Sequence, residues 1–283
     1  MKKFLSSIFA LLIFVSAFAQ ERPAPQPAPE TSELFKLGVA GYSFAFIKKD
    51  GKADLDKALE TLEKADVHYL CIKDFHLPFN SSDAEIAAFH EKLKSKGVTG
   101  YGVGPIYMKT KEAVDQGFEY AKRVGVKLIV GVPDYELLPY VDQKIKEYDM
   151  YYAIHIHGPD IKEYPDAEDV WNHVKDLDPR LGMCLDVGHN LRNGKCPVEA
   201  LKKYHTRVFD MHLKDVTGNT RLGYSVEVGR GIIDFPALVK MMRKVKYNGV
   251  ISLEHERNME DPYMGIAESI GYFRAIVAAT KKN

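Results

Sequence analysis

The stretch Leu181–Asn190, LGMCLDVGHN, decides the fold of this chain. It is a short apolar run that ends at Asp186, turns at Gly188 and presents His189. A buried strand ends on a carboxylate only where something uses the charge, because an unpaired buried charge is costly. We therefore interpret the stretch as a core strand whose carboxyl end faces a polar site.

Three further stretches have the same design: Tyr152–Gly158 (YAIHIHG), Val208–Asp215 (VFDMHLKD) and Val250–Glu256 (VISLEHE). Such apolar runs alternate with helical patterns along the whole chain, which is typical of parallel strands joined by crossover helices. The predicted strands are Leu37–Ser43, Tyr69–Lys73, Val98–Val103, Lys127–Gly131, Tyr152–His157, Leu181–Val187, Arg207–Lys214 and Gly249–Glu254.

Eight strand–helix repeats of about 30 residues predict an α/β protein, a single-domain (β/α)8 TIM barrel over residues 35–283. The structural alternative is a doubly wound open sheet. That fold usually carries a Gly-rich phosphate-binding turn after its first strand, and Gly41–Phe44 (GYSF) does not match such a turn.

The amino-terminal residues predict export. Residues 1–19 have a charged start, an apolar run over Phe4–Val15 and an A-x-A cleavage site at Ala17–Ala19, so we expect a signal peptide. The apolar run is too short for a comfortable membrane span. Residues 20–34 contain the Pro/Ala-rich segment ERPAPQPAPE and are expected to form a linker. We expect an exported, periplasmic protein with no membrane span after cleavage.

The charge balance and the cysteines limit the classes of partner. The chain has 39 basic and 39 acidic side chains, so nothing in its charge indicates a nucleic acid partner. Cys71, Cys184 and Cys196 do not form a metal-type cluster or a disulfide framework. The sequence leaves the oligomeric state open, a homo-oligomer included.

The polar strand ends predict a metal site. In a barrel the side chains at the carboxyl ends of the strands face the active site, and His155, Asp186, His212 and Glu254 come from four neighbouring strands. We predict that they hold one divalent metal ion, with Mn, Co, Zn, Fe or Mg as candidates, because nitrogen and oxygen donors suit such ions. The alternative is four ordinary polar residues in unrelated loops, which their occurrence at successive strand ends disfavours.

The pattern LDVGHN, followed by HLKD and LEHE, resembles the xylose isomerase-like TIM barrels, also called the sugar phosphate isomerase/epimerase family. The resemblance covers essentially the whole mature chain, and GYSF, IKDFHLPF and YGVGPIYM resemble its exported branch. It implies one metal ion on His155, Asp186, His212 and Glu254, with His189 near the metal and the substrate. The DNA-repair branch of the family uses a larger metal cluster, which an exported neutral chain does not fit.

One position departs from the family pattern. The ligand on the fifth strand is typically a Glu, and this chain has His155. In the ketose epimerases of the family, that Glu and the Glu of the eighth strand transfer protons on opposite faces of the sugar. A metal-bound His155 cannot act as a base. The resemblance therefore implies proton transfer on one face of the sugar, or β-elimination.

Other polar residues are candidates for catalysis and substrate binding. The metal would polarise a carbonyl and stabilise the enediolate formed by removal of the adjacent proton. The expected acids and bases are Glu254, His189, Lys73 and Glu227. The expected substrate-binding residues are His76, His157, Lys214, Arg221, Arg257 and Tyr42. Core packing or a solvated loop position is the alternative for most of them.

The resulting hypothesis is a divalent-metal-dependent, sugar isomerase/epimerase-like enzyme that abstracts the proton α to a carbonyl of a sugar or sugar derivative. One alternative is a lyase that eliminates the aglycone from a keto-glycoside. Another is a non-catalytic carbohydrate-binding barrel. A metal hydrolase is disfavoured, because no carboxylate pair suited to glycoside cleavage is evident. Each hypothesis implies a small carbohydrate partner.

Overall fold

The structure is a computed structural model that describes residues 33–281. The expected signal peptide, residues 1–19, and all but the last two residues of the expected linker lie outside the described residues. None of the helices in residues 33–281 combines the length and the apolar character that crossing a membrane requires.

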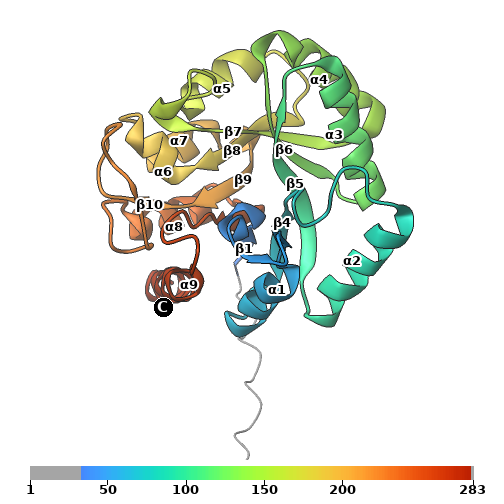
Figure 1. Cartoon of the computed structure of the whole chain (residues 1–283). Helices are drawn as coiled ribbons and strands as arrows, with labels where there is room; N and C mark the ends of the chain where they lie inside the picture. The colour runs from blue at the N-terminus through green and yellow to red at the C-terminus, as the bar shows by residue number, and fades with distance from the viewer. Residues whose placement is uncertain (1–32, 282–283) are drawn as a thin grey trace, which may run out of the picture. The chain divides into compact units, whose positions relative to one another are not determined.

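Parallel strands close into a barrel, and this confirms the predicted TIM barrel (Figure 1). The strands follow one another around the barrel in chain order, and the last pairs with the first. They are β1 (Lys36–Ala40), β4 (Tyr69–Ile72), β5 (Thr99–Met108), β6 (Leu128–Pro133), β7 (Tyr151–His155), β8 (Leu181–Asp186), β9 (Val208–Leu213) and β12 (Val250–Leu253).

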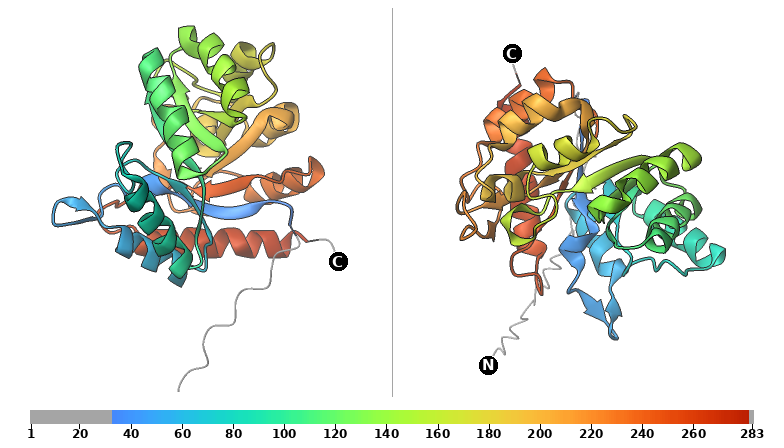
Figure 2. Two further views of the ribbon diagram at one scale, coloured as in Figure 1. Left: turned by 90° about the vertical axis from the view of Figure 1, so that its right-hand side faces the viewer. Right: turned by 90° about the horizontal axis from the view of Figure 1, so that it is seen from above.

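Helices form the outer layer around the barrel (Figures 1 and 2). They are α1 (Leu55–Lys64), α2 (Asp83–Ser95), α3 (Lys111–Val124), α4 (Leu138–Tyr148), α5 (Ala167–Val174), α6 (Val187–Arg192), α7 (Pro197–Tyr204), α8 (Phe235–Lys244) and α9 (Tyr263–Ala279). Helix α3 shows how the local sequence sets the start, the buried face and the end of a helix. Thr110 caps its start by accepting the N–H of Ala113, Val114 and Phe118 are buried, and Gly125 ends it at φ 78°, a conformation that favours glycine.

Short elements lie in several of the loops between the barrel strands and helices. Strands β2 (Lys48–Lys49) and β3 (Lys52–Ala53) form a hairpin that extends away from the barrel in Figure 2. Strands β10 (Asp215–Val216) and β11 (Ser225–Val226) pair antiparallel in the loop after β9. Single 3-10 turns cover Gly41–Phe44, Tyr135–Leu137, Gly158–Asp160 and His205–Arg207.

The strand boundaries differ from the prediction by one or two residues at most ends, and by more at the ends of β1 and β5. The first strand ends at Ala40 instead of Ser43, because the chain turns at Gly41, where an added Cβ would lie 2.7 Å from the carbonyl oxygen of Cys71. Strand β5 continues past Val103 to Met108. Helix α6 was not predicted, because six residues are too few to show a helical period.

Candidate metal centre

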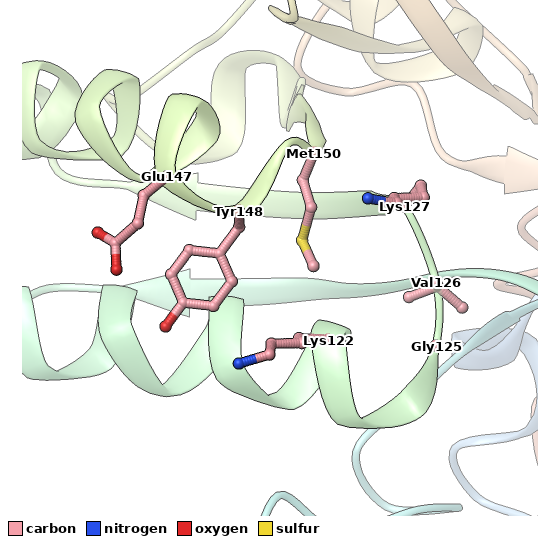
Figure 3. A pocket seen from close by; sticks show the side chains of 7 residues that line it. All are labelled: Lys122, Gly125, Val126, Lys127, Glu147, Tyr148 and Met150. Atoms are coloured by element: carbon pink, nitrogen blue, oxygen red, sulfur yellow. The ribbon is translucent and has the colours of Figure 1, made fainter.

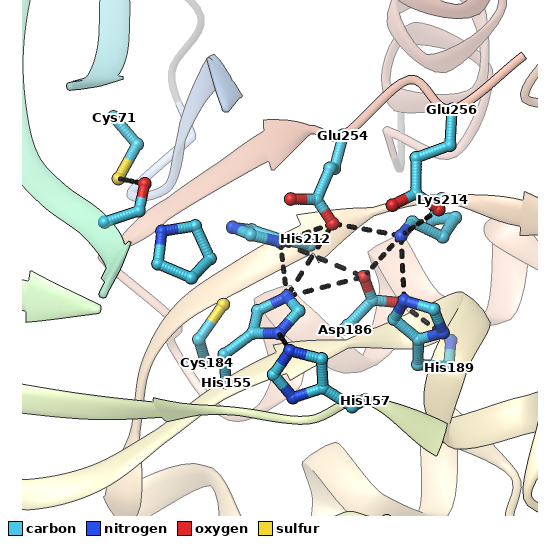
Figure 4. A network of polar contacts seen from close by, with 12 residues as sticks. Cys71, His155, His157, Cys184, Asp186, His189, His212, Lys214, Glu254 and Glu256 are labelled. Atoms are coloured by element: carbon cyan, nitrogen blue, oxygen red, sulfur yellow. Dashed lines mark hydrogen bonds and ion pairs between the residues drawn. The ribbon is translucent and has the colours of Figure 1, made fainter. Parts of the chain in front are cut away.

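Four side chains from neighbouring strands meet inside the carboxyl end of the barrel (Figure 4). One donor atom from each of His155, Asp186, His212 and Glu254 lies within 4.8 Å of the others, and all four residues are buried. The Nδ1 atom of His212 lies 2.9 Å from His155 Nε2 and 3.1 Å from Glu254 Oε2. The structure thus brings together all four predicted metal ligands.

The strand register and a helix cap position these donors. Asp186 of β8 pairs with His212 of β9, so both side chains come to the same level of the barrel. Asp186 Oδ1 accepts the backbone N–H of His189 at 2.7 Å and thereby caps α6. Its Oδ2 atom faces the cluster and has no hydrogen-bond partner among the described residues. One carboxylate therefore caps the helix with one oxygen and faces the cluster with the other.

The protonation states fit a cation site. Burial and the neighbouring His157 hold the pKa of His155 well below its usual value. Burial raises the pKa of Asp186. Burial alone would lower the pKa of His212, but Glu254 and the nearby aspartates raise it to about 9. Without a metal, His212 therefore carries a proton where the four donors converge.

The chemistry of this donor set fits a divalent ion. Two imidazoles and two carboxylates are ligands that Mn²⁺, Co²⁺, Fe²⁺ and Zn²⁺ accept. A metal ion would bind Asp186 Oδ2, which has no hydrogen bond, and would replace the displaceable proton on His212. We conclude that the residues present fit a metal ion, and the identity of the ion stays open.

Lys214 lies inside this cluster, although the sequence predicted it to bind substrate. Its side chain is 1% exposed, and its Nζ lies 2.9 Å from Glu254 Oε2 and 2.8 Å from Glu256 Oε2. Asp186 Oδ2 is 3.2 Å away. Burial alone would lower the pKa of Lys214, but the three carboxylates raise it well above its usual value. The lysine is therefore a fixed ammonium ion.

His189 is placed beside Lys214. Its Nε2 atom lies 3.1 Å from Lys214 Nζ, and burial together with this ammonium lowers the pKa of His189 to about 3. Arg192 approaches the other ring nitrogen at 3.4 Å and forms an ion pair with Asp160. His189 is therefore uncharged at neutral pH, and its Nε2 atom accepts a hydrogen bond from the ammonium of Lys214.

His157 contacts the cluster through His155. Its Nε2 atom lies 3.3 Å from His155 Nδ1 and 2.7 Å from the hydroxyl of Tyr107. The sequence predicted a contact between His157 and substrate hydroxyls, whereas its contacts in the structure orient His155. The exposed Tyr107 extends this chain of contacts to the surface.

A buried polar layer formed by Asp210, Tyr101 and Cys184 lies on the Nε2 side of His212. It was not predicted from the sequence. Asp210 is fully buried, and its Oδ2 atom lies 3.7 Å from His212 Nε2. Tyr101 donates its hydroxyl to Asp210 at 3.2 Å, and Cys184 donates its thiol at 3.6 Å. Burial raises the pKa of Asp210 to about 6. The sequence does indicate that Asp210 lies on the same side as His212, because the two residues are two apart on one strand and so share a face.

Tyr42 and His76, two predicted substrate-binding residues, follow β1 and β4 in the chain. Burial and the carboxylates of Glu256 and Glu254 raise the pKa of Tyr42. The His76 ring is tilted against Phe44 and meets Phe75 edge-on, with ring centroids 6.4 and 4.6 Å away. Both His76 nitrogens are buried and lack a partner among the described residues. Burial lowers the pKa of His76 to about 4.

Four other candidates have their contacts elsewhere. Lys73 donates to the carbonyl of Pro105 at 2.6 Å and pairs with Asp74. Glu227 lies 3.7 Å from both Arg257 and Arg230. Arg221 is exposed and lies 4.0 Å from Asp160. Within residues 33–281, no hydrogen bond or ion pair joins Lys73, Glu227, Arg257 or Arg221 to the four donors.

Asp215 orders the loop that carries Glu227. Its carboxylate accepts the backbone N–H groups of Gly229 and Gly231 at 2.9 and 2.8 Å. A Cβ on Gly231 would lie 2.2 Å from the same carboxylate, so only glycine fits there. The residues of the HLKD motif thus have two roles. His212 and Lys214 are part of the cluster, and Asp215 binds the backbone of the loop.

A surface hollow lies away from this cluster (Figure 3). It is lined by Lys122, Gly125, Val126, Lys127, Glu147, Tyr148 and Met150. Gly125–Lys127 and Met150 directly precede β6 and β7, so the hollow is at the amino end of the barrel strands. Active sites of TIM barrels lie at the other end. The hollow is therefore not part of the candidate site.

Comparisons with known proteins show the family to which this chain belongs. The family model "Xylose isomerase-like TIM barrel" matches residues 70–276. Inosose dehydratase of Geobacillus kaustophilus is 31% identical over 129 residues, 40% of this chain and 41% of the relative. The chain thus matches less than half the length of this curated relative.

Two solved structures share the architecture at lower identity. A crystal structure of the IOLI protein "with a binding zinc atom" is 17% identical, with a TM-score of 0.67, and the match covers 88% of this chain and 100% of that one. D-psicose 3-epimerase of Clostridium cellulolyticum H10, solved with D-tagatose, is 18% identical with a TM-score of 0.67, covering 86% and 99%. At these identities the likeness shows the fold. The names of the dehydratase and the epimerase state carbohydrate-acting enzymes, the class that the sequence predicts.

Proposed function

The chain belongs to the xylose isomerase-like TIM barrel family, and from this premise we propose that it is a divalent-metal-dependent enzyme that removes the proton next to a carbonyl of a sugar or sugar derivative. The observation that carries the proposal is the convergence of His155, Asp186, His212 and Glu254 at the carboxyl end of the barrel. Relatives whose names state a zinc atom, an epimerase or a dehydratase support it.

A divalent ion held by these four residues supplies Lewis-acid polarisation of the substrate carbonyl. Glu254 is the proposed base. Burial alone would raise its pKa, but His212 and Lys214 hold the pKa well below its usual value, so the group is a carboxylate at neutral pH. Its contacts to His212 and Lys214 use Oε2. The other oxygen is the one we assign to proton transfer. His189, the other base that the sequence predicted near the metal, has its two ring nitrogens beside Lys214 and Arg192, which favours Glu254 for this role.

The proton transfer that we propose takes place on one face of the substrate. His155 occupies the position from which family epimerases use a carboxylate, and both of its nitrogens are engaged, Nε2 with His212 and Nδ1 with His157. It cannot accept a proton from the opposite face. This favours isomerisation through one face, or β-elimination, over inversion of a stereocentre.

The second candidate function is a lyase that eliminates the aglycone from a keto-glycoside. Two observations favour it: the absence of a carboxylate at position 155, and the dehydratase name of the curated relative, since loss of water from a carbonyl compound is also an elimination. The expected export signal leads us to propose further that the substrate is met outside the cytoplasm, in the periplasm.

Product analysis tests the proposal. Purified protein loaded with Mn²⁺ or Co²⁺ is incubated with free aldoses, ketoses and keto-glycosides, and the products are separated by chromatography with mass detection. An interconverted sugar indicates an isomerase or epimerase, and a released aglycone indicates a lyase. Metal-loaded protein that binds sugars and converts none of them would contradict the proposal and identify a carbohydrate-binding barrel. The Asp186→Ala variant controls for contaminating enzymes.

A further inference from the structure

A second cation position adjoins the candidate metal site. Donor atoms of His189, Glu254 and Glu256 lie within 4.8 Å of one another, a spacing that could hold a metal ion. Lys214 Nζ occupies the space among them, at 3.1, 2.9 and 2.8 Å from the three donors (Figure 4). The ammonium thus takes the contacts that a second ion would make.

The two positions share carboxylates. Glu254 Oε2 contacts both His212 Nδ1 and Lys214 Nζ, at 3.1 and 2.9 Å. Asp186 Oδ2 lies 3.8 Å from His212 Nδ1 and 3.2 Å from Lys214 Nζ, and it has no hydrogen-bond partner in the described part of the chain. Shared carboxylates are what bridge paired metal ions in two-metal sites. Here one of the two bridged cations is a side chain.

The fold is shaped to keep the lysine in place. A Cβ added at Gly188 would lie 2.8 to 3.0 Å from the side-chain carbons of Lys214, so the glycine of the LDVGH turn makes room for the stem. One divalent ion and one ammonium also balance the three carboxylates of Asp186, Glu254 and Glu256. A second divalent ion beside the ammonium would face direct charge repulsion at about 3 Å.

We propose that Lys214 is a tethered cation that fills the second metal position and limits the centre to one metal ion per chain. The inference rests on the metal site of the proposed function. It predicts that removal of the ammonium creates a second site, formed by His189, Glu254 and Glu256. Lys214 then determines the metal stoichiometry of the centre, apart from any contact with substrate.

Metal counting tests this. Full-length protein is titrated with Mn²⁺ by calorimetry, and bound metal is measured by elemental analysis after gel filtration. We expect one ion in the wild type and in Lys214→Arg, and two ions in Lys214→Ala. Electron paramagnetic resonance should show an isolated Mn²⁺ in the wild type and a spin-coupled pair in Lys214→Ala. The double variant Lys214→Ala/His189→Ala should return to one ion, because it removes a donor of the second site.

The outcomes separate the two proposals. Wild-type protein that binds no metal contradicts the proposed function. A wild type that binds one ion together with a folded Lys214→Ala variant that also binds one overturns only the role of Lys214. If Lys214→Ala does not fold, Lys214→Gln removes the charge with less loss of packing and is expected to gain the second ion. Spin-coupled Mn²⁺ pairs in the wild type would overturn the inference without any variant.

Discussion

The Nε2 atom of His155 lies 2.9 Å from the Nδ1 atom of His212. The two rings come from β7 and β9, on either side of β8. Two ring nitrogens at this distance must share a proton or a cation, because two lone pairs facing each other in a buried site repel. The carboxylates of Asp186 and Glu254 each lie within 3.8 Å of both nitrogens. The pair is therefore the centre of the cation site.

Removal of one donor should abolish tight metal binding. His212→Ala or Asp186→Ala leaves three donors and an incomplete coordination sphere, so we expect the affinity for Mn²⁺ or Zn²⁺ to fall by more than about a hundredfold. Calorimetric titration of the apo protein measures it. His173→Ala, which changes a half-exposed histidine on α5, is the matched control and should bind metal as the wild type does. Stoichiometric metal in Asp186→Ala would refute the four-donor assignment.

Asp210 should tune the affinity without touching the metal. Asp210→Asn keeps the size of the side chain but removes the charge that lies 3.7 Å from His212 Nε2. Loss of such a supporting group typically weakens metal binding about 10- to 100-fold, and we expect a change in this range. Asp149→Asn, at an exposed site, is the control. An unchanged affinity in Asp210→Asn would show that the polar layer serves packing alone.

The sequence predicted the barrel and the four donors for one physical reason. A strand that is buried along its length and polar at its end can be recognised from its own residues alone, as in Leu181–Asp186 and Val250–Glu254. Parallel closure then brings these ends together. The alternation of side chains along a strand explains why these donors point into the barrel, since His155, His212 and Glu254 each fall on the inward face.

What the sequence could not predict depends on contacts between distant segments. The bonds of Lys214 to Asp186, Glu254 and Glu256 join three strand ends, and nothing local indicates which carboxylates a lysine will meet. Lys73 was predicted to end a strand, but β4 ends one residue earlier, at Ile72, and the Lys73 ammonium is bound to the carbonyl of Pro105. Loop positions such as Glu227 and Arg221 are the least predictable, because turns and ion pairs outside the barrel fix them.

The residue at position 155 should control the faces on which protons move. His155→Glu replaces a neutral ligand by a carboxylate that can bind the metal and also accept a proton. We expect the variant to keep metal and to gain epimerase-like hydrogen exchange on the opposite face of a ketose. Metal analysis and stereospecific NMR of the product measure both properties. A variant without metal would contradict the placement of residue 155 in the coordination sphere.

His76 should make stability depend on pH. Its pKa is lowered to about 4 in the folded state, against an ordinary value of 6.5, because burial disfavours the imidazolium. The neutral ring therefore adds full stability above pH 6.5, and that contribution falls as the pH drops through 5 toward 4. We expect a loss of about 2 kcal/mol between pH 7.5 and pH 5 from this group. Urea unfolding at the two pH values measures it, and His76→Phe should lose about 2 kcal/mol less than the wild type. Equal losses would contradict a buried neutral His76.

The most direct test of the proposed chemistry is proton NMR in D₂O of the metal-loaded protein with ketoses, aldoses and keto-glycosides, recorded after excess Mn²⁺ or Co²⁺ is removed. We predict loss of the signal from the C–H next to the carbonyl, either with the carbon skeleton kept or together with aglycone release. Glu254→Gln and the metal-free protein should both leave that signal intact. A metal-bound wild type that exchanges no proton on any of these substrates would contradict the account.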